Sequence, residues 1–142
     1  MADFLQSVTE AFKSLLSRGL LTVESSEYDA QAFGNAIVVL AGQNLRIRMV
    51  RDRGEVFAEA ASSLRPNDWF PLQRAVRAVG ISSPPPEGLL TPQQAAEIVE
   101  QYFAELERGF GNSHIGATRT ALAELEHFAL KKLTDRVKRG ST

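Results

Sequence analysis

The sequence predicts a single α+β domain with an N-terminal helix, an antiparallel meander of about four strands, a short helix and a C-terminal helical hairpin. Changes in hydrophobic periodicity support this prediction. Apolar residues recur at helical spacing before Gly19, alternate with polar residues between Ala36 and Ala60, and return to helical spacing after Asp68. The length of 142 residues, with 44% hydrophobic and 23% charged residues, is typical of one globular domain.

The N-terminal helix is expected from Asp3 to Arg18, because large apolar side chains recur there every three or four positions. These side chains are Phe4, Leu5, Val8, Phe12, Leu15 and Leu16. Gly19 follows directly and is placed to end the helix, since glycine readily adopts the left-handed conformation that follows many helices. Looser alternation from Leu20 to Tyr28 predicts a first strand.

The clearest strand is LRIRM at 45–49, where three apolar residues alternate with Arg46 and Arg48, the pattern of a strand with one buried face. Turn-forming residues flank it at 42–44 and 52–54. If the two hairpin loops are centred on Gly42-Gln43 and on Asp52-Arg53, apolar residues of all three strands lie on one face of the sheet. The predicted pairs are Leu40 with Leu45, Val38 with Ile47, Ala36 with Met49, Met49 with Val56 and Ile47 with Ala58.

A short helix is expected after the meander, capped by Asn67 or Asp68 and ending at Val79, with Pro71 tolerated in its first turn. Its apolar stripe is predicted to consist of Trp69, Leu72, Val76 and Val79. The segment SSPPPEG at 82–88 then forms a linker that three consecutive prolines stiffen towards polyproline II.

The linker divides the single domain into a helix–sheet–helix part, residues 1–81, and a helical hairpin, residues 89–142. Residues 91–94, TPQQ, open the first helix of the hairpin with an N-cap threonine, a proline in the first turn and a capping-box glutamine. The second helix is expected from about Thr118 to Arg139. Its inward-facing residues are predicted to be Leu122, Leu125, Ala129, Leu133 and Val137.

Composition excludes several classes of site. The chain has no cysteine, which rules out disulfides, thiolate nucleophiles and cysteine-ligated metals. Its start lacks the basic segment of a secretory signal, and the longest apolar run, 36–41, is too short to span a bilayer. We therefore expect a cytoplasmic protein without a membrane partner. The formal net charge of −1 gives no strong attraction to nucleic acid.

Catalytic signatures are weak. His114 and His127 are the only histidines, and Glu124 with His127 has the Glu-x-x-His spacing of di-iron bundles. No second such motif exists, and both side chains lie opposite the predicted apolar stripe, so a solvated helix face is the better interpretation. The glycine-rich segment 109–116 is better explained as a helix–helix turn than as a phosphate loop. We expect no catalytic residue, no metal and no cofactor. A hydrolase or small-molecule-binding domain that uses Asp, Glu and Arg stays an open alternative.

The second face of the predicted sheet is the candidate binding surface, because large apolar groups and guanidinium groups alternate on it. Interface cores favour aromatic and Arg side chains over Lys, and this chain has no Lys between Lys13 and Lys131. The predicted partner-binding residues are Val39, Arg46, Arg48 and Phe57, with Arg51 and Arg53 at the rim. An acidic or mixed protein surface is the expected partner, and a homodimer is left open.

Two other interpretations of this face are kept. In the first, the first or last helix covers Val39 and Phe57 and leaves the arginines as solvated ion-pair partners of glutamates. In the second, the arginines bind nucleic acid or serve a regulatory protein. Nucleic acid is disfavoured because the predicted register sets Arg46 opposite Glu59, and because the sequence lacks the aromatic ladder of single-strand binders.

Three segments carry a resemblance to a known group of proteins. Phe33-Gly34-Asn35, LRIRMVRDRGEVF at 45–57 and Trp69-Phe70-Pro71-Leu72 resemble small bacterial α+β proteins, some of which are immunity proteins encoded beside polymorphic toxins. The resemblance covers about a third of the chain and leaves out the C-terminal helices. It implies a non-enzymatic cytoplasmic protein that neutralises a cognate toxin by masking it, and it brings no catalytic residues.

Overall fold

The computed structural model describes residues 3–31, 34–83 and 85–140, and the side chains of the last helix as far as Thr134. Phe33 and Pro84, which belong to the resemblance and to the predicted linker, lie outside the described residues, as does the side chain of Val137.

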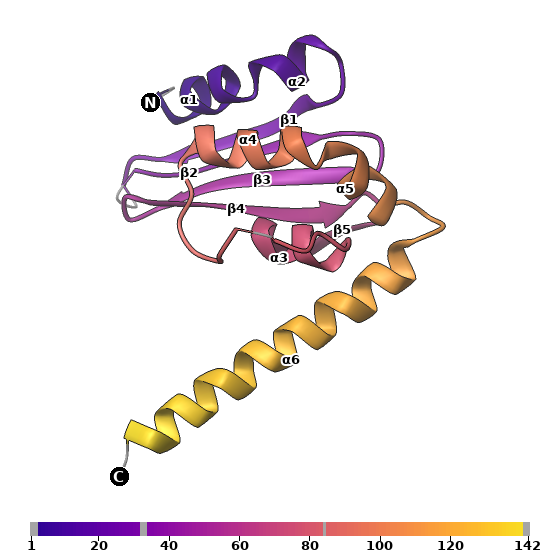
Figure 1. Cartoon of the computed structure of the whole chain (residues 1–142). Coiled ribbons are helices and arrows are strands. Elements are labelled where there is room, and N and C mark those ends of the chain that lie inside the picture. Colours follow the sequence, from indigo (N-terminus) through magenta and orange to yellow (C-terminus); the bar gives the residue numbers. More distant parts are fainter. Residues whose placement is uncertain (1–2, 32–33, 84, 141–142) are drawn as a thin grey trace.

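Five strands form one antiparallel sheet in sequence order (Figure 1): β1 (Thr22–Asp29), β2 (Asn35–Ala41), β3 (Leu45–Asp52), β4 (Glu55–Ser62) and β5 (Arg65–Pro71). The α+β class and the antiparallel meander are thereby confirmed, with one more strand than the four expected. The additional strand is β5, where the sequence predicted a loop and a helix cap. Pro66 and Pro71 are tolerated there because β5 is an edge strand, which does not need every backbone N–H for the ladder.

Both hairpin registers differ from the predicted ones by two residues. Leu40 pairs with Ile47, and Met49 pairs with Ala58. The second turn is Arg53–Gly54, with φ of 53° and 82°, so it lies one residue later than predicted and has the two left-handed residues of a type I′ turn. Because side chains alternate with a period of two, a two-residue shift leaves every residue on its predicted face.

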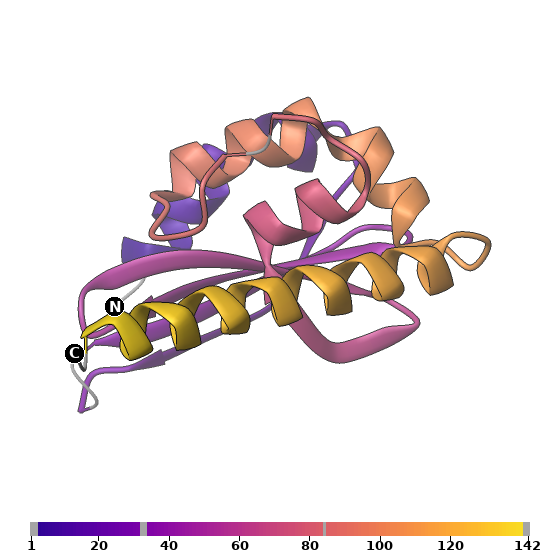
Figure 2. The ribbon, with the colours of Figure 1, turned by 60° about the horizontal axis from the view of Figure 1, so that its bottom comes forward.

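Five helices cover one face of the sheet (Figure 2): α1 (Asp3–Ala11), α2 (Lys13–Ser17), α3 (Leu72–Ala78), α4 (Pro92–Gln101) and α5 (Phe103–Gly109). The predicted N-terminal helix is interrupted at Phe12, whose ring is buried, and the chain leaves it through Gly19 at a φ of 71° as expected. The helix cap predicted at 91–94 is confirmed, since Thr91 accepts from the Gln94 N–H and Gln94 accepts from the Thr91 N–H.

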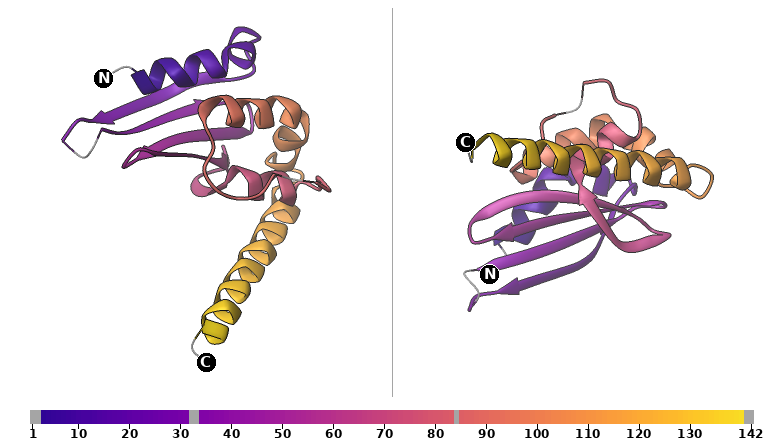
Figure 3. Two further views of the ribbon diagram at one scale, coloured as in Figure 1. Left: turned by 60° about the vertical axis from the view of Figure 1, so that its left-hand side comes forward. Right: turned by 90° about the horizontal axis from the view of Figure 1, so that it is seen from below.

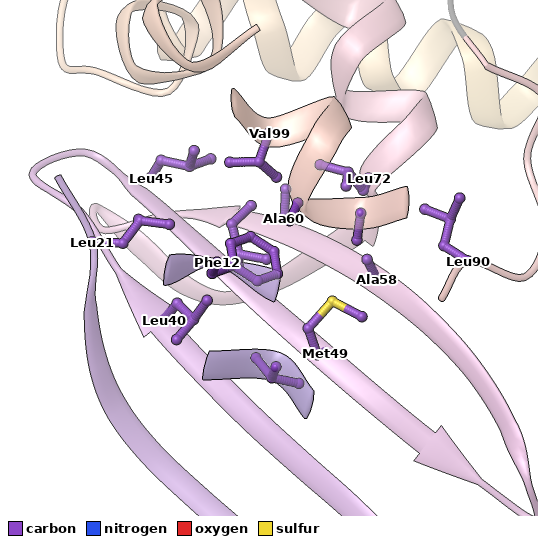
Figure 4. Close-up of a cluster of buried hydrophobic side chains, with 14 of the residues drawn as sticks. Phe12, Leu21, Leu40, Leu45, Met49, Ala58, Ala60, Leu72, Leu90 and Val99 are labelled. Carbon is purple, nitrogen blue, oxygen red and sulfur yellow. The ribbon is translucent and has the colours of Figure 1, made fainter. Parts of the chain in front are cut away.

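The hydrophobic core lies between this helical layer and the sheet (Figure 4). Strands contribute alternate residues from their inner face, such as Leu40, Ile47 and Met49, and the helices contribute side chains such as Phe12 and Val99. All five are almost completely buried. This burial holds α1 and α4 side by side across β2, β3 and β4.

The C-terminal helices differ from the expected hairpin. The segment after α3 returns to the sheet, where the Leu90 N–H donates to the Val56 carbonyl at 2.9 Å, and α4 then packs on β4 and α1. Helix α6 (Ile115–Gly140) packs mainly on α3 and α5 and then leaves the body (Figure 3). The prediction that Ala129 and Leu133 face inward is wrong, because α6 has left the body at that level and both are exposed.

No helix in the part of the chain that the structure describes combines the length and the apolar character needed to cross a bilayer.

Candidate functional site

The second face of the sheet carries no helix among the described residues. In the view from below, the helices lie on one side of the sheet and the other side is open (Figure 3, right). The helix–strand contacts of α1, α3 and α4 are all made with the face that carries the core. The interpretation in which the first or last helix covers this face is therefore wrong. We call this surface the open face.

An apolar row crosses the centre of the open face. Ile37 of β2, Val50 of β3 and Phe57 of β4 are direct cross-strand partners, so their side chains stand next to each other on one face. All three are half-buried although no helix in the described part of the chain covers them. In the neighbouring row Val39 is only 7% exposed, because it lies on an interior strand beside the long side chain of Arg48.

A second feature is the arginine–tryptophan stack, formed by Arg46, Trp69 and Arg48. The two guanidinium carbons lie 5.1 Å and 4.4 Å from the centroid of the Trp69 ring. Both distances are within the range of cation–π attraction, for which Trp is the strongest partner. Arg46 and Arg48 project from β3 two residues apart, and Trp69 reaches them from β5.

Each arginine of the stack also has a carboxylate partner. Arg46 forms an ion pair with Glu24 of β1, and Arg48 donates to Glu59 Oε1 at 2.8 Å from its Nε. The predicted opposition of Arg46 and Glu59 is wrong, since the two-residue register shift sets Arg48 opposite Glu59. The arginine side chains are 16% and 27% exposed. Their positive charges are therefore largely compensated within the face.

Outside the stack, the open face and the turn at its edge carry three carboxylates and Arg53. Glu27 of β1 pairs with Ile37 and so lies on this face, and Asp52 of β3 pairs with Glu55 at the tip of the second hairpin. All three carboxylates are exposed, and none forms an ion pair with any residue that the structure describes. We call Glu27, Asp52 and Glu55 the acidic rim.

The structure brings together four of the six predicted site residues, Val39, Arg46, Arg48 and Phe57. Arg51 lies on the opposite, helix-covered face, where its guanidinium is 5.1 Å from the Phe4 ring and donates to the Gly34 carbonyl. Arg53 occupies the exposed turn, and its backbone N–H donates to Asn35 Oδ1 at 2.8 Å. Of the two residues predicted at the rim, Arg51 and Arg53, only Arg53 therefore lies at the edge of the open face.

A hollow of about 310 Å³ adjoins the apolar row at the edge of β4. Phe57, Glu59 and Pro71 line it from the sheet, and Leu89 lines it from the segment before α4. That segment is fixed to α3, since Arg74 forms two hydrogen bonds of 3.0 and 2.8 Å with Glu87. The hydrogen bond to Glu87 also raises the pKa of Arg74 above its ordinary value.

Sequence reasoning placed Glu55 on this face but missed Trp69, Glu24 and the other two members of the acidic rim, Glu27 and Asp52. Trp69 was assigned to the stripe of a helix, because a segment with two prolines does not show the signature of a strand. One signal could have placed Trp69 on the open face. Phe70 packs on the core, and the alternate positions Asn67, Trp69 and Pro71 then belong to the opposite face of a strand.

The other side chains considered for catalysis or metal binding form no site in the described part of the chain. His114, Glu124 and His127 are all exposed, and no group of three metal-ligating side chains occurs within residues 3–31, 34–83 and 85–134. The glycine-rich segment 109–116 connects α5 to α6, as the turn interpretation predicted.

The fold and this surface define an α+β module in which one face of the sheet is covered by helices and the other is open. Comparisons with protein-family models, with curated proteins and with solved structures find no match to the chain.

Proposed function

We propose that this protein is a non-enzymatic protein-binding module that docks a partner protein on the open face of its sheet. The observation that carries the proposal is the apolar row of Ile37, Val50 and Phe57, which none of the helices that the structure describes covers. Antiparallel sheets with one solvated face normally present polar residues there. A row of three large apolar side chains across that face is the kind of surface that marks an interaction site.

The residues around the apolar row are of the types that are enriched in protein–protein interfaces. Aromatic and Arg side chains are enriched in interface cores, and Arg48, which lies in the row next to the apolar row, stacks on Trp69 together with Arg46. Because the ion pairs and the ring hold both guanidinium groups in place, the partner meets a surface that is already ordered and loses little side-chain entropy on binding. The hollow beside Phe57 has room for one large side chain of the partner.

The charges favour a basic partner. The arginines of the stack are compensated by Glu24 and Glu59, whereas the three carboxylates of the acidic rim outnumber the one arginine beside them, Arg53. A partner with Lys or Arg residues opposite the rim gains attraction and faster association. The same rim repels phosphate, which argues against nucleic acid. Of the acidic or mixed partner surfaces that the sequence suggested, the acidic one is disfavoured for the same reason.

The resemblance to immunity proteins supplies a particular form of the proposal. In that form the partner is a toxin, and the open face masks it. The prediction is that co-expression protects cells from the product of a neighbouring toxin gene, and that Val50→Lys removes the protection. A metabolic gene neighbourhood, together with turnover of a small molecule by the purified protein, would instead favour the enzyme alternative.

Photo-crosslinking tests the proposal. A benzoyl-phenylalanine placed at position 57 should yield an adduct with one partner protein, whereas the same group at Leu64, an exposed apolar residue in the β4–β5 turn, should not. Val50→Lys should abolish the adduct, because it places a charge in the middle of the apolar row. Asp52→Lys combined with Glu55→Lys should slow association and reverse its salt dependence. Equal adducts from positions 57 and 64 would contradict the proposal.

A further inference from the structure

Strand β1 forms one edge of the sheet, at the margin opposite β5 (Figure 1). One side of β1 pairs with β2, and no other strand in the part of the chain that the structure describes pairs with its other side. All eight residues of β1 are exposed, so none of the described helices covers this edge. An edge strand of this kind presents a row of backbone N–H and C=O groups to which another chain can add a strand.

The opposite edge of the sheet is protected by features that β1 lacks. Strand β5 contains Pro66 and Pro71, which cannot donate to an added strand. Where β5 no longer accompanies β4, the Leu90 N–H donates to the Val56 carbonyl at 2.9 Å. Strand β1 contains no proline and no lysine, the residues that commonly block an edge. The sheet therefore has one closed edge and one open edge.

The register shows which backbone groups of β1 point outward. Residues of an antiparallel strand bond in alternation to the strands on its two sides. The Gly42 N–H donates to the Leu45 carbonyl, so every second residue of β2 counted back from Gly42 bonds to β3, and the residues between them bond to β1. Ser25 pairs with one of those residues, so Ser26 and Tyr28 direct their N–H and C=O groups away from the sheet. No other residue that the structure describes bonds to these groups.

On the helix-covered side, the core is incomplete at this edge. A hollow of about 240 Å³ lies between α1 and β1, lined by Leu5 of α1 and by Ser26 and Tyr28 of β1 among others. Val23 and Tyr28 face the same side of the sheet as the core, yet they are 43% and 46% exposed. Every second side chain of a strand added to β1 would lie over this hollow, where apolar groups gain most from burial.

On the other side of the sheet, the same edge is acidic. Glu27 is the cross-strand partner of Ile37, is exposed, and forms no ion pair with any described residue. A second hollow, of about 300 Å³, lies beside it and is also lined by Asn35 and Ile37. The remaining side chains of an added strand would lie here, and a lysine or arginine among them would form a cross-strand pair with Glu27.

We propose that the β1 edge binds an extended segment of a partner protein in which apolar residues alternate with lysine or arginine. The segment adds a sixth strand to the sheet beside residues 25–29. Its backbone bonds to the outward N–H and C=O groups of Ser26 and Tyr28, which supplies affinity. Its apolar side chains enter the hollow under α1 and its basic side chains face Glu27, which supplies specificity.

Charge disfavours a second copy of β1 as the occupant of this edge. Strand β1 carries three acidic residues and no basic one, so two β1 strands side by side would bring the carboxylates of both copies to one seam. Like charges that face each other across strands are destabilising. A basic segment gains from the same carboxylates, so the charge of the edge selects one kind of strand and rejects the other.

This binding goes beyond the proposed function, because it uses the backbone of an edge strand and not the apolar row of the open face. Val50→Lys changes the row on β3, two strands from β1, and leaves the edge as it is. A substitution at Ser26 changes the edge and leaves the row as it is. Each proposal can therefore fail without the other.

Fluorescence anisotropy with a fluorescein-labelled peptide of alternating lysine and valine tests the proposal. The wild type should bind the peptide saturably. Ser26→Pro should weaken binding roughly tenfold or more, because it removes an outward N–H and sets a ring on the edge, while the ladder to β2 does not use this N–H. Ser26→Ala is the matched control, since it keeps the N–H and should bind like the wild type. Absence of binding by the wild type, or equal binding by the two variants with unchanged circular dichroism, would overturn the inference.

Charge variants test the selectivity of the edge. A peptide of alternating glutamate and valine should not bind the wild type, and Glu27→Lys should reverse the preference between the two peptides. Glu55→Lys is the control, because β4 lies three strand spacings from β1, about 14 Å at about 4.8 Å each, which exceeds the screening length of about 8–10 Å. Equal effects of the two substitutions would show that the peptide responds only to net charge, which contradicts the proposed contact.

Amide hydrogen exchange followed by NMR tests the contact without any substitution. In the free protein the outward N–H groups of Ser26 and Tyr28 should exchange quickly, whereas those of Ser25 and Glu27, which bond to β2, should exchange slowly. Saturation with the lysine–valine peptide should slow exchange at Ser26 and Tyr28 at least about tenfold. Unchanged exchange at these two positions in the saturated complex would place the peptide elsewhere and overturn the inference. A dimer of the wild type that Ser26→Pro converts to a monomer would also overturn it, because a second copy would then occupy the edge.

Discussion

Replacement of Trp69 by leucine tests whether the arginine–tryptophan stack stabilises the open face. Leucine keeps an apolar side chain on β5 but removes the ring that both guanidinium groups approach, at 5.1 Å and 4.4 Å. A cation–π contact contributes about 0.5–1 kcal/mol at an exposed site and more when desolvated. Since Arg46 and Arg48 are only 16% and 27% exposed, the two contacts together should contribute about 1–2 kcal/mol.

The assay is urea unfolding followed by far-UV circular dichroism, because the variant loses the only tryptophan of the chain and with it the fluorescence signal. Trp69→Phe is the matched control, since it keeps a ring with weaker cation–π attraction and should lose less stability than Trp69→Leu. If both variants unfold within about 0.5 kcal/mol of the wild type, the guanidinium contacts do not stabilise the fold and the reasoning is refuted.

Three further substitutions test the packing. Phe57→Ala should cost clearly less than the ~3–5 kcal/mol typical of a buried Phe, measured by urea unfolding, and a loss in that range would mean that the face is covered. Gly109→Ala should destabilise by about 1–3 kcal/mol, because its Cβ would collide with the side chain of Val79, and an unchanged melting temperature would show that this contact relaxes freely. Glu107→Ala should cost about 1–3 kcal/mol in the same assay, since its carboxylate accepts the backbone N–H of Asn44 at 2.8 Å, and a neutral effect would mean that water replaces it.

Local periodicity was sufficient to predict the faces of the meander but not its register. Ile47 and Met49 are buried as expected, because alternation alone determines which face a strand residue occupies. The pairing depends on which two residues form each turn, and Arg53–Gly54 and Asp52–Arg53 are both plausible from composition. The shift moved Glu59 from Arg46 to Arg48 while keeping all three residues on the open face.

Tertiary contacts decided the features that the sequence could not predict. Trp69 has the apolar character of a helix stripe, and only pairing of the β5 segment with β4 places it beside the arginines. Glu24 lies 22 residues before Arg46 in the sequence. The two side chains form a hydrogen bond because β1 pairs with β2 as the edge strand on that side of β3. The stripe of α6 was correctly identified as apolar, but periodicity does not indicate whether an apolar stripe faces its own body or another molecule.

The sole tryptophan gives the most direct test of binding at the open face. Protein labelled with 5-fluorotryptophan has a single ¹⁹F resonance, from Trp69, which contacts Arg46 and Arg48 on the open face and is half-buried. Addition of the unlabelled partner identified by crosslinking should shift or broaden this resonance, and the change should be lost with Val50→Lys. An unchanged resonance at a saturating concentration of a partner that binds elsewhere on the chain would contradict the proposal that the open face is the binding site.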